Sequence, residues 1–164
     1  MSFGRRGNDK RDALCISVFA VGAIVAGLPY GAVSTVPQAF DRMRGHGMPS
    51  PPMLQNKLHS ASRHEGPWPN ISVWHGTADR TIDIANSQAI IDQWRGVHRV
   101  DDPASDLIKG HEHLVWKDES GRDAIEFYRI AGMGHGTPLN VESGYGSSGA
   151  YMLNVGISST EVMA

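Results

Sequence analysis

Residues 71–79 read Ile-Ser-Val-Trp-His-Gly-Thr-Ala-Asp, a short apolar run that passes directly into a glycine-containing loop ending at Asp79. The same arrangement returns later in the chain, where the apolar run 125–130 (IEFYRI) leads into the loop AGMGHGTPL and its histidine, His135. Short apolar runs bounded by turn residues are typical of buried strands. Asp79 and His135 would therefore each follow the carboxyl end of a strand.

The segments around these two strands are helical in pattern. Helices are expected over residues 36–44, 50–63 and 84–98, and the third has apolar residues at helical spacing. A polar linker at 101–103 follows, and residues 114–117 form a further expected strand before a turn at 119–121. Strands that alternate with helices predict an α/β fold, with a mostly parallel sheet and helices on its faces.

In parallel sheets, ligands bind beyond the carboxyl ends of the strands. Taken alone, Asp79 could be a turn residue whose carboxylate accepts backbone N–H groups, and His135 could be an exposed loop histidine. Their matching positions, with the acid first and the histidine second, follow the nucleophile–acid–base order of the α/β-hydrolases. We therefore expect a carboxylate oxygen of Asp79 within hydrogen-bond reach of a His135 ring nitrogen, at ~2.6–3.2 Å.

Composition restricts the class of protein. The 164 residues suggest one domain with a sizeable core. A net charge of −2 gives no reason to expect nucleic acid or an anionic membrane as a partner. The single cysteine, Cys15, excludes an internal disulfide.

The start of the chain has two interpretations. A basic stretch precedes the apolar run 13–31 (ALCISVFAVGAIVAGLPYG), which resembles a signal peptide. A stable membrane span is not expected, because Pro29 closes the run before ~20 apolar residues are reached. The alternative is a buried strand at 21–26 (VGAIVA), parallel to residues 71–74 and followed by a loop at 27–31. Composition alone leaves both interpretations open.

Three motifs carry a family resemblance. In chain order they are IVAGLPYGA, SVWHGTADRTI and AGMGHGTPL. Together they resemble the polyhydroxybutyrate depolymerase-type esterases, which are α/β-hydrolases related to feruloyl and acetylxylan esterases. The resemblance covers about residues 18–160 and implies the C-terminal part of an α/β-hydrolase fold. It also implies that Asp79 is the acid and His135 the base of a serine triad.

The resemblance carries further implications. The substrate would be an ester, in a polyester or an acylated polysaccharide, no cofactor would be needed, and the location would be extracellular. Tyr30, in GLPYG, could line the same cleft as the triad residues, although packing against the next helix is the alternative role.

The chain departs from the family pattern at the nucleophile. It contains no G-x-S-x-G pentapeptide, and its nearest imitation, YGSSG at 145–149, follows the histidine instead of preceding the acid. Residues 1–17 are expected to be an atypical N-terminal segment and residues 18–164 a partial, inactive hydrolase domain. The alternative is a non-catalytic, secreted or membrane-tethered binding module built on a hydrolase scaffold.

Other residues invite separate interpretations. His111 and His113 alternate along a strand, so their imidazoles could share one face and bind a metal with His135. An exposed strand edge is the favoured interpretation, because no further ligands occur at suitable spacing, and no metal site is expected. The four tryptophans are expected in the core.

Overall fold

The computed structural model describes residues 21–61, 66–144 and 146–162. Its strands are β1 (Val21–Val25), β2 (Asn70–Gly76), β3 (Ala104–Ile108), β4 (His111–Lys117), β5 (Asp123–Ile130), β6 (Thr137–Leu139) and β7 (Met152–Asn154). Its helices are α1 (Val36–Met43), α2 (Pro51–Ala61), α3 (Ala85–His98) and α4 (Ser159–Val162), with a 3₁₀ turn at Val141–Ser143.

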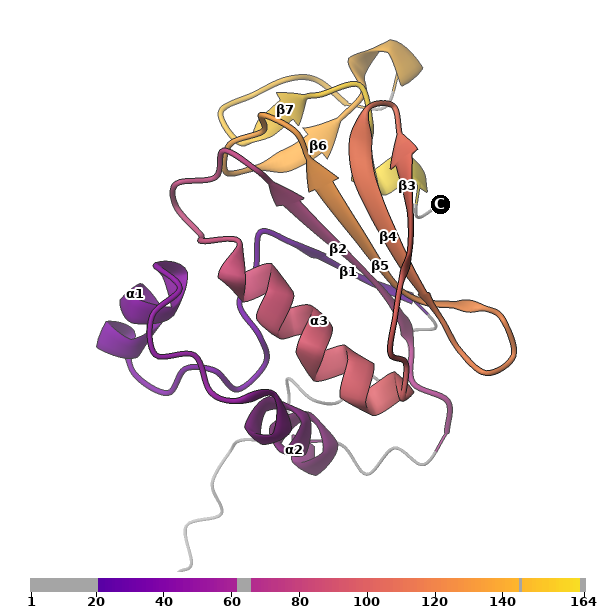
Figure 1. Cartoon of the computed structure of the whole chain (residues 1–164). Coiled ribbons are helices and arrows are strands. Elements are labelled where there is room, and N and C mark those ends of the chain that lie inside the picture. The colour runs from indigo at the N-terminus through magenta and orange to yellow at the C-terminus, as the bar shows by residue number, and fades with distance from the viewer. Residues whose placement is uncertain (1–20, 62–65, 145, 163–164) are drawn as a thin grey trace, which may run out of the picture.

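One five-stranded sheet organises the fold, in the order β1-β2-β5-β4-β3. Strands β1, β2 and β5 run parallel, and β4 and β3 continue the sheet as an antiparallel hairpin. Helix α3 crosses one face of the sheet and packs against α2 (Figure 1). The parallel strands and flanking helices confirm the predicted α/β class.

The core lies on both faces of the parallel strands. All of β2 from Ile71 to Gly76 is buried, as expected for a strand covered on both sides. On the α3 side, β2 and β5 pack against Ile90, Ile91 and Trp94. On the other side, the rings of Trp74 and Tyr128 stack 3.7 Å apart beneath apolar residues of the C-terminal segment.

The expected tryptophan burial is largely confirmed. Trp74, Trp94 and Trp116 are buried, and Trp68 is half-buried against the same core.

The strand interpretation of residues 21–26 is confirmed. Strand β1 pairs in parallel with β2, from Val21 opposite Asn70 to Val25 opposite Trp74. The expected N-terminal segment 1–17 and the first part of the apolar run 13–31 lie outside the described residues. In the portion of the chain that is described, no helix combines the length and apolar character needed to cross a membrane.

The linker expected at 101–103 has no regular structure, and an unpredicted strand follows it. Residues 104–108 form β3, a largely exposed strand that pairs with β4 through a two-residue turn. Lys109 and Gly110 in this turn both have positive φ, at 51° and 83°, as tight hairpin turns require. An exposed strand at the edge of a sheet lacks the alternating apolar residues by which strands are recognised in a sequence, so β3 was not predicted.

The expectation of an exposed strand edge at His111 and His113 is wrong. Strand β3 covers the outer side of β4, and both histidines are buried. His111 donates from Nε2 to the Val155 carbonyl at 3.0 Å and accepts the Ala131 N–H at Nδ1 at 3.2 Å. His113 lies 2.9 Å from both Asp106 and Glu126. Across the described residues, no group of three or more histidine, cysteine, aspartate or glutamate side chains could hold a metal ion.

Candidate functional site

Two loops meet at one edge of the sheet. Because β2 and β5 are parallel neighbours, the loops that follow Gly76 and Ile130 leave the sheet side by side (Figure 1). Several hydrogen bonds join them, including Thr77 N–H to the Ile130 carbonyl at 3.0 Å, Ala78 N–H to the Met133 carbonyl at 2.9 Å, and Gly132 N–H to the Thr77 hydroxyl at 2.9 Å. The two loops therefore form one connected unit.

Gly76 makes this close contact possible. A Cβ atom at this position would lie 2.1 Å from the Met133 carbonyl oxygen and 2.7 Å from the Gly134 carbonyl oxygen. Both neighbours are backbone atoms, so neither can rotate away. The β2 strand can end against the second loop only because residue 76 has no side chain.

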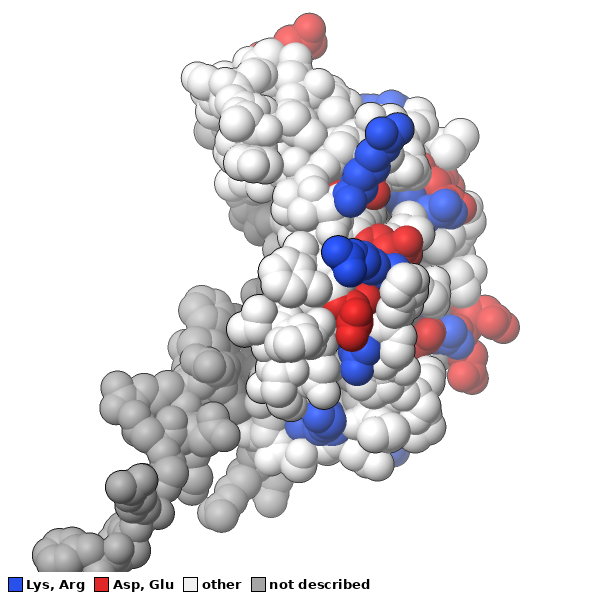
Figure 2. Space-filling model, turned by 90° about the vertical axis from the view of Figure 1, so that its left-hand side faces the viewer, with Lys and Arg blue, Asp and Glu red and all other residues white. Residues whose placement is uncertain are grey.

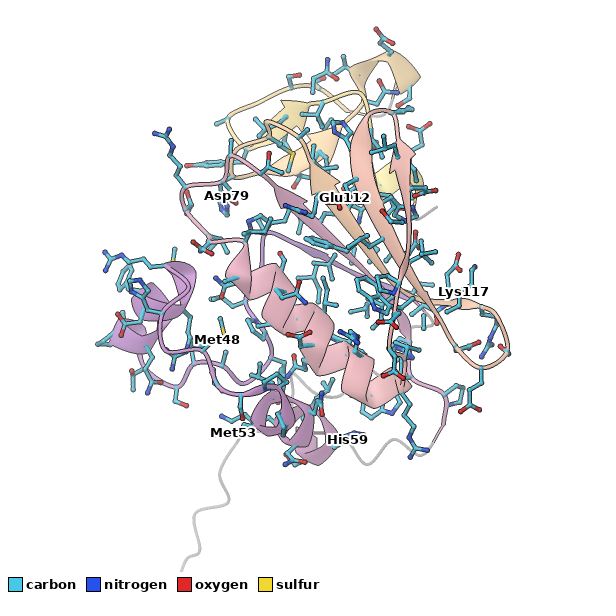
Figure 3. All side chains as sticks on the ribbon, in the orientation of Figure 1. Met48, Met53, His59, Asp79, Glu112 and Lys117 are labelled. Atoms are coloured by element: carbon cyan, nitrogen blue, oxygen red, sulfur yellow. The ribbon has the colours of Figure 1, made fainter. Side chains whose placement is uncertain are left out.

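Asp79 lies in the first loop (Figure 3), with its side chain fully buried. Its Oδ1 accepts the N–H groups of Thr81 and Ile82 at 2.8 and 3.0 Å, and its Oδ2 accepts His135 Nδ1–H at 2.9 Å. Burial alone would raise the pKa of Asp79, but the hydrogen bonds from Ile82, His135 and Thr81 outweigh it and hold this pKa below its ordinary value. The carboxylate is therefore ionised at neutral pH.

His135 faces solvent on its other side, with 31% of its side chain exposed. An ionised carboxylate can only accept, so Nδ1 carries a hydrogen, and in the neutral ring Nε2 is then the nitrogen with a lone pair. No described residue forms a hydrogen bond with Nε2. The ring meets Tyr151 edge-on, with 6.2 Å between centroids. An imidazole in this state can accept a proton from a hydroxyl placed at Nε2.

A close backbone contact explains why residue 136, directly after His135, is a glycine. A Cβ atom at Gly136 would lie 2.7 Å from the Tyr151 carbonyl oxygen, which accepts the Thr137 N–H at 2.8 Å. The segment before β7 can therefore approach the histidine loop only at a glycine. By contrast, a Cβ at Gly134 would have no atom within 4 Å.

The predicted contact between Asp79 and His135 is thus present, but Tyr30 does not join it. The Tyr30 backbone donates to and accepts from the Gln93 amide, at 3.1 and 3.0 Å, along the middle of α3. The residue is 43% exposed, and no hydrogen bond or ring contact joins its side chain to Asp79 or His135. The lining role of Tyr30 stays a prediction. Ser147 is exposed and likewise has no hydrogen bond to His135.

A further site residue was missed in the sequence. His75 lies fully buried behind Asp79, with Nε2 3.9 Å from Asp79 Oδ2. The motif HGTAD contains this histidine, but only the aspartate of the motif was predicted to be a site residue. Burial lowers the pKa of His75, so the ring is neutral.

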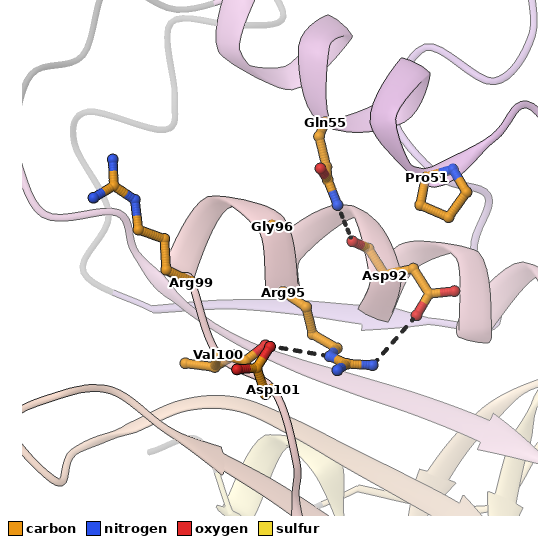
Figure 4. A pocket seen from close by; sticks show the side chains of 8 residues that line it. All are labelled: Pro51, Gln55, Asp92, Arg95, Gly96, Arg99, Val100 and Asp101. Atoms are coloured by element: carbon orange, nitrogen blue, oxygen red, sulfur yellow. Dashed lines mark hydrogen bonds and ion pairs between the residues drawn. The ribbon is translucent and has the colours of Figure 1, made fainter.

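A surface pocket of about 520 Å³ lies elsewhere, between α2 and the end of α3 (Figure 4). Gln55 in its wall donates to the Asp92 carbonyl at 2.8 Å, and Arg95 donates to the Val100 carbonyl at 3.3 Å. Gln55 thus joins α2 to α3, and Arg95 joins α3 to the segment that follows it. The pocket is therefore separate from the site of Asp79 and His135.

Stability should fall as the pH drops below neutrality. Burial lowers the pKa of both His75 and His98 below 6.5. Below that pH the unfolded chain binds protons that the folded chain does not, so acid favours unfolding, by at most about 1.4 kcal/mol per pH unit for each histidine. Urea unfolding at a series of pH values between neutral and mildly acidic measures this slope. The dependence of the free energy of unfolding on pH should be weaker in His98→Gln. A free energy of unfolding that rises with acidification would contradict the prediction.

On the face that Figure 2 shows, acidic and basic side chains are interspersed rather than gathered by sign. This pattern agrees with the net charge of −2 in giving no indication of a nucleic-acid surface.

No family model matches the chain, but its sequence is similar to those of several ester-cleaving enzymes. It is 37% identical over 150 residues to poly(3-hydroxyalkanoate) depolymerase C of Paucimonas lemoignei, covering 87% of this chain and 36% of that protein. It is 29% identical over 126 residues to an acetylxylan esterase of Coprinopsis cinerea, covering 74% and 34%. It is 28% identical over 134 residues to feruloyl esterase B of Talaromyces stipitatus, covering 76% and 37%.

The chain thus spans about a third of the length of these curated relatives. Among solved structures, it is similar to an acetyl xylan esterase from Aspergillus awamori, with a TM-score of 0.67 and 19% identity, covering 80% of this chain and 51% of that one. At that identity the likeness concerns the fold alone. It confirms the arrangement of sheet and helices expected from the sequence.

Proposed function

Because this chain is homologous to the polyhydroxybutyrate depolymerase-type esterases over most of its length, we propose that it carries the acid and the base of a serine-type carboxylic ester hydrolase. The observation that carries the proposal is the 2.9 Å contact between Asp79 Oδ2 and His135 Nδ1. It joins a buried, ionised carboxylate to a half-exposed imidazole whose other nitrogen is free.

Each residue has a defined task in this proposal. As a serine hydroxyl attacks the ester carbonyl, His135 Nε2 takes the hydroxyl proton, and the ring becomes an imidazolium. Asp79 stays ionised, holds the ring orientation and stabilises the positive charge. When the tetrahedral intermediate collapses, Nε2 returns the proton to the leaving alcohol oxygen.

The nucleophile is proposed to lie outside these 164 residues, because none of their serines lies in a G-x-S-x-G elbow. By itself the chain should then be inactive. The names of the relatives support an ester in a polyester or an acylated polysaccharide as the substrate. An extracellular location stays part of the proposal. Tyr30 is retained as a proposed substrate-lining residue.

The purified chain should not react with a fluorophosphonate probe. Such probes label a serine only when a base activates its hydroxyl, and no serine here occupies a nucleophile elbow. Intact-mass spectrometry after labelling gives the stoichiometry directly. A stoichiometric label on Ser147 that disappears in His135→Ala would refute the claim that the nucleophile comes from elsewhere.

A further inference from the structure

A second buried polar pair lies behind Asp79. His75 and Ser87 are both fully buried, and His75 Nδ1 lies 2.8 Å from the Ser87 hydroxyl. On its other side, His75 Nε2 lies 3.0 Å from the Ile82 carbonyl oxygen. The pair thus links β2, which carries His75, the loop containing Asp79 and Ile82, and the start of α3, which carries Ser87.

The partners define the protonation of the His75 ring. A carbonyl oxygen can only accept, so Nε2 carries the proton and donates it to Ile82. Nδ1 is then an acceptor, and the Ser87 hydroxyl donates to it. A neutral ring with one fixed tautomer agrees with the lowered pKa that burial gives His75.

Ile82 connects this pair to the acid. Its carbonyl accepts from His75, while its N–H donates to Asp79 Oδ1 at 3.0 Å. Both backbone groups of one residue are therefore fixed, and the turn from Asp79 to Ile82 is held from its buried side. His75 Nε2 is 3.9 Å from Asp79 Oδ2, which is too far for a direct hydrogen bond, so its effect passes through Ile82.

We propose that His75 and Ser87 are positioning residues, which hold the turn at Ile82 so that Asp79 Oδ2 stays aimed at His135 Nδ1. The inference rests on the proposed function. Without His75, the Ile82 carbonyl loses its buried donor. Without the Ser87 hydroxyl, His75 Nδ1 loses its partner, so the ring is no longer held with Nε2–H aimed at the Ile82 carbonyl. In either case the turn relaxes. Asp79 then no longer keeps the His135 proton on Nδ1.

The His135 tautomer is a readout that loss of core packing alone would not change. We would measure it on the whole 164-residue chain by nitrogen NMR of labelled histidine rings at neutral pH. The wild type should give a single Nδ1–H tautomer for His135. Ser87→Ala and His75→Leu should lose this single form and give a mixture with the Nε2–H tautomer.

Two control variants sharpen the result. His75→Gln should restore the Nδ1–H tautomer, because a glutamine amide can donate to the Ile82 carbonyl. Ser72→Ala removes another buried serine hydroxyl, which accepts from Trp74 at 3.0 Å on the same strand, and should leave the His135 tautomer unchanged. If His75→Leu does not fold, the Ser87→Ala variant still tests the proposal, because it removes only one oxygen atom.

The outcomes separate this inference from the function on which it rests. A single Nδ1–H tautomer that persists in Ser87→Ala but is lost in Asp79→Asn would overturn the positioning role and leave the acid–base pair intact. Failure of His75→Gln to restore the tautomer would also overturn it. A His135 tautomer unchanged in Asp79→Asn would overturn the pair itself, and with it the proposed function.

Discussion

Gly76→Ala should destabilise the chain by about 3–5 kcal/mol, a large part of the ~5–15 kcal/mol that stabilises a typical domain. The new Cβ would lie 2.1 Å from the Met133 carbonyl oxygen, where ordinary contacts begin at 3.4 Å. The two loops would have to separate by more than about 1 Å, which also breaks the Ala78 to Met133 hydrogen bond. Chemical denaturation followed by tryptophan fluorescence measures the loss.

Gly134→Ala is the matched control. Gly134 lies in the same pair of loops, immediately before His135, but a Cβ there meets no atom within 4 Å, and its φ is outside the left-handed region. We expect a change within about 0.5 kcal/mol, the usual range for an open surface position. Equal destabilisation by the two substitutions would mean that the loops do not contact each other as described.

Most of the fold that the sequence predicted has strong apolar patterns, although α1, which was also predicted, contains no buried residue. Strands β1, β2 and β5 and helix α3 have the buried runs or spacing that these elements require. Strand β3 has neither, because almost all of it is exposed. Strands β6 and β7 have three residues each and are fixed by pairing with each other, a non-local contact that no local pattern reports.

For the site, topology was sufficient to bring Asp79 and His135 together. Two neighbouring parallel strands end at the same edge of the sheet, so the loops that follow them lie close together. This alone was enough to predict the contact. The need for glycine at position 76 depends instead on the carbonyl oxygen of Met133, a residue 57 positions later in the chain. The contacts of His75 with Ser87 and Ile82 also depend on how the loop folds over the strand, which strand and helix periodicity do not encode.

The second large effect is expected in a chimeric enzyme that supplies the nucleophile proposed to lie outside this chain. In it, this chain would replace the matched segment of poly(3-hydroxyalkanoate) depolymerase C of Paucimonas lemoignei, to which it is 37% identical over 150 residues. If Asp79 and His135 are the acid and base, the chimera should hydrolyse a short-chain p-nitrophenyl ester. Asp79→Asn should then lower kcat about 10⁴-fold by favouring the wrong imidazole tautomer, and His135→Ala should lower it by about 10⁶-fold.

Matched substitutions away from the site provide the reference. His46 and Asp102 are both exposed, and neither forms a hydrogen bond or ion pair with Asp79 or His135, so His46→Ala and Asp102→Asn should leave kcat within about twofold of the parent chimera. They show whether a loss in the site variants exceeds the general effect of removing a histidine or a carboxylate.

The kcat of the His135→Ala chimera relative to its parent is the most direct test of an acid–base pair in this chain. The expected result is an active parent whose ester hydrolysis disappears in His135→Ala and falls about 10⁴-fold in Asp79→Asn, while both variants remain folded. A parent chimera whose activity survives His135→Ala would contradict the assignment of this histidine as the base.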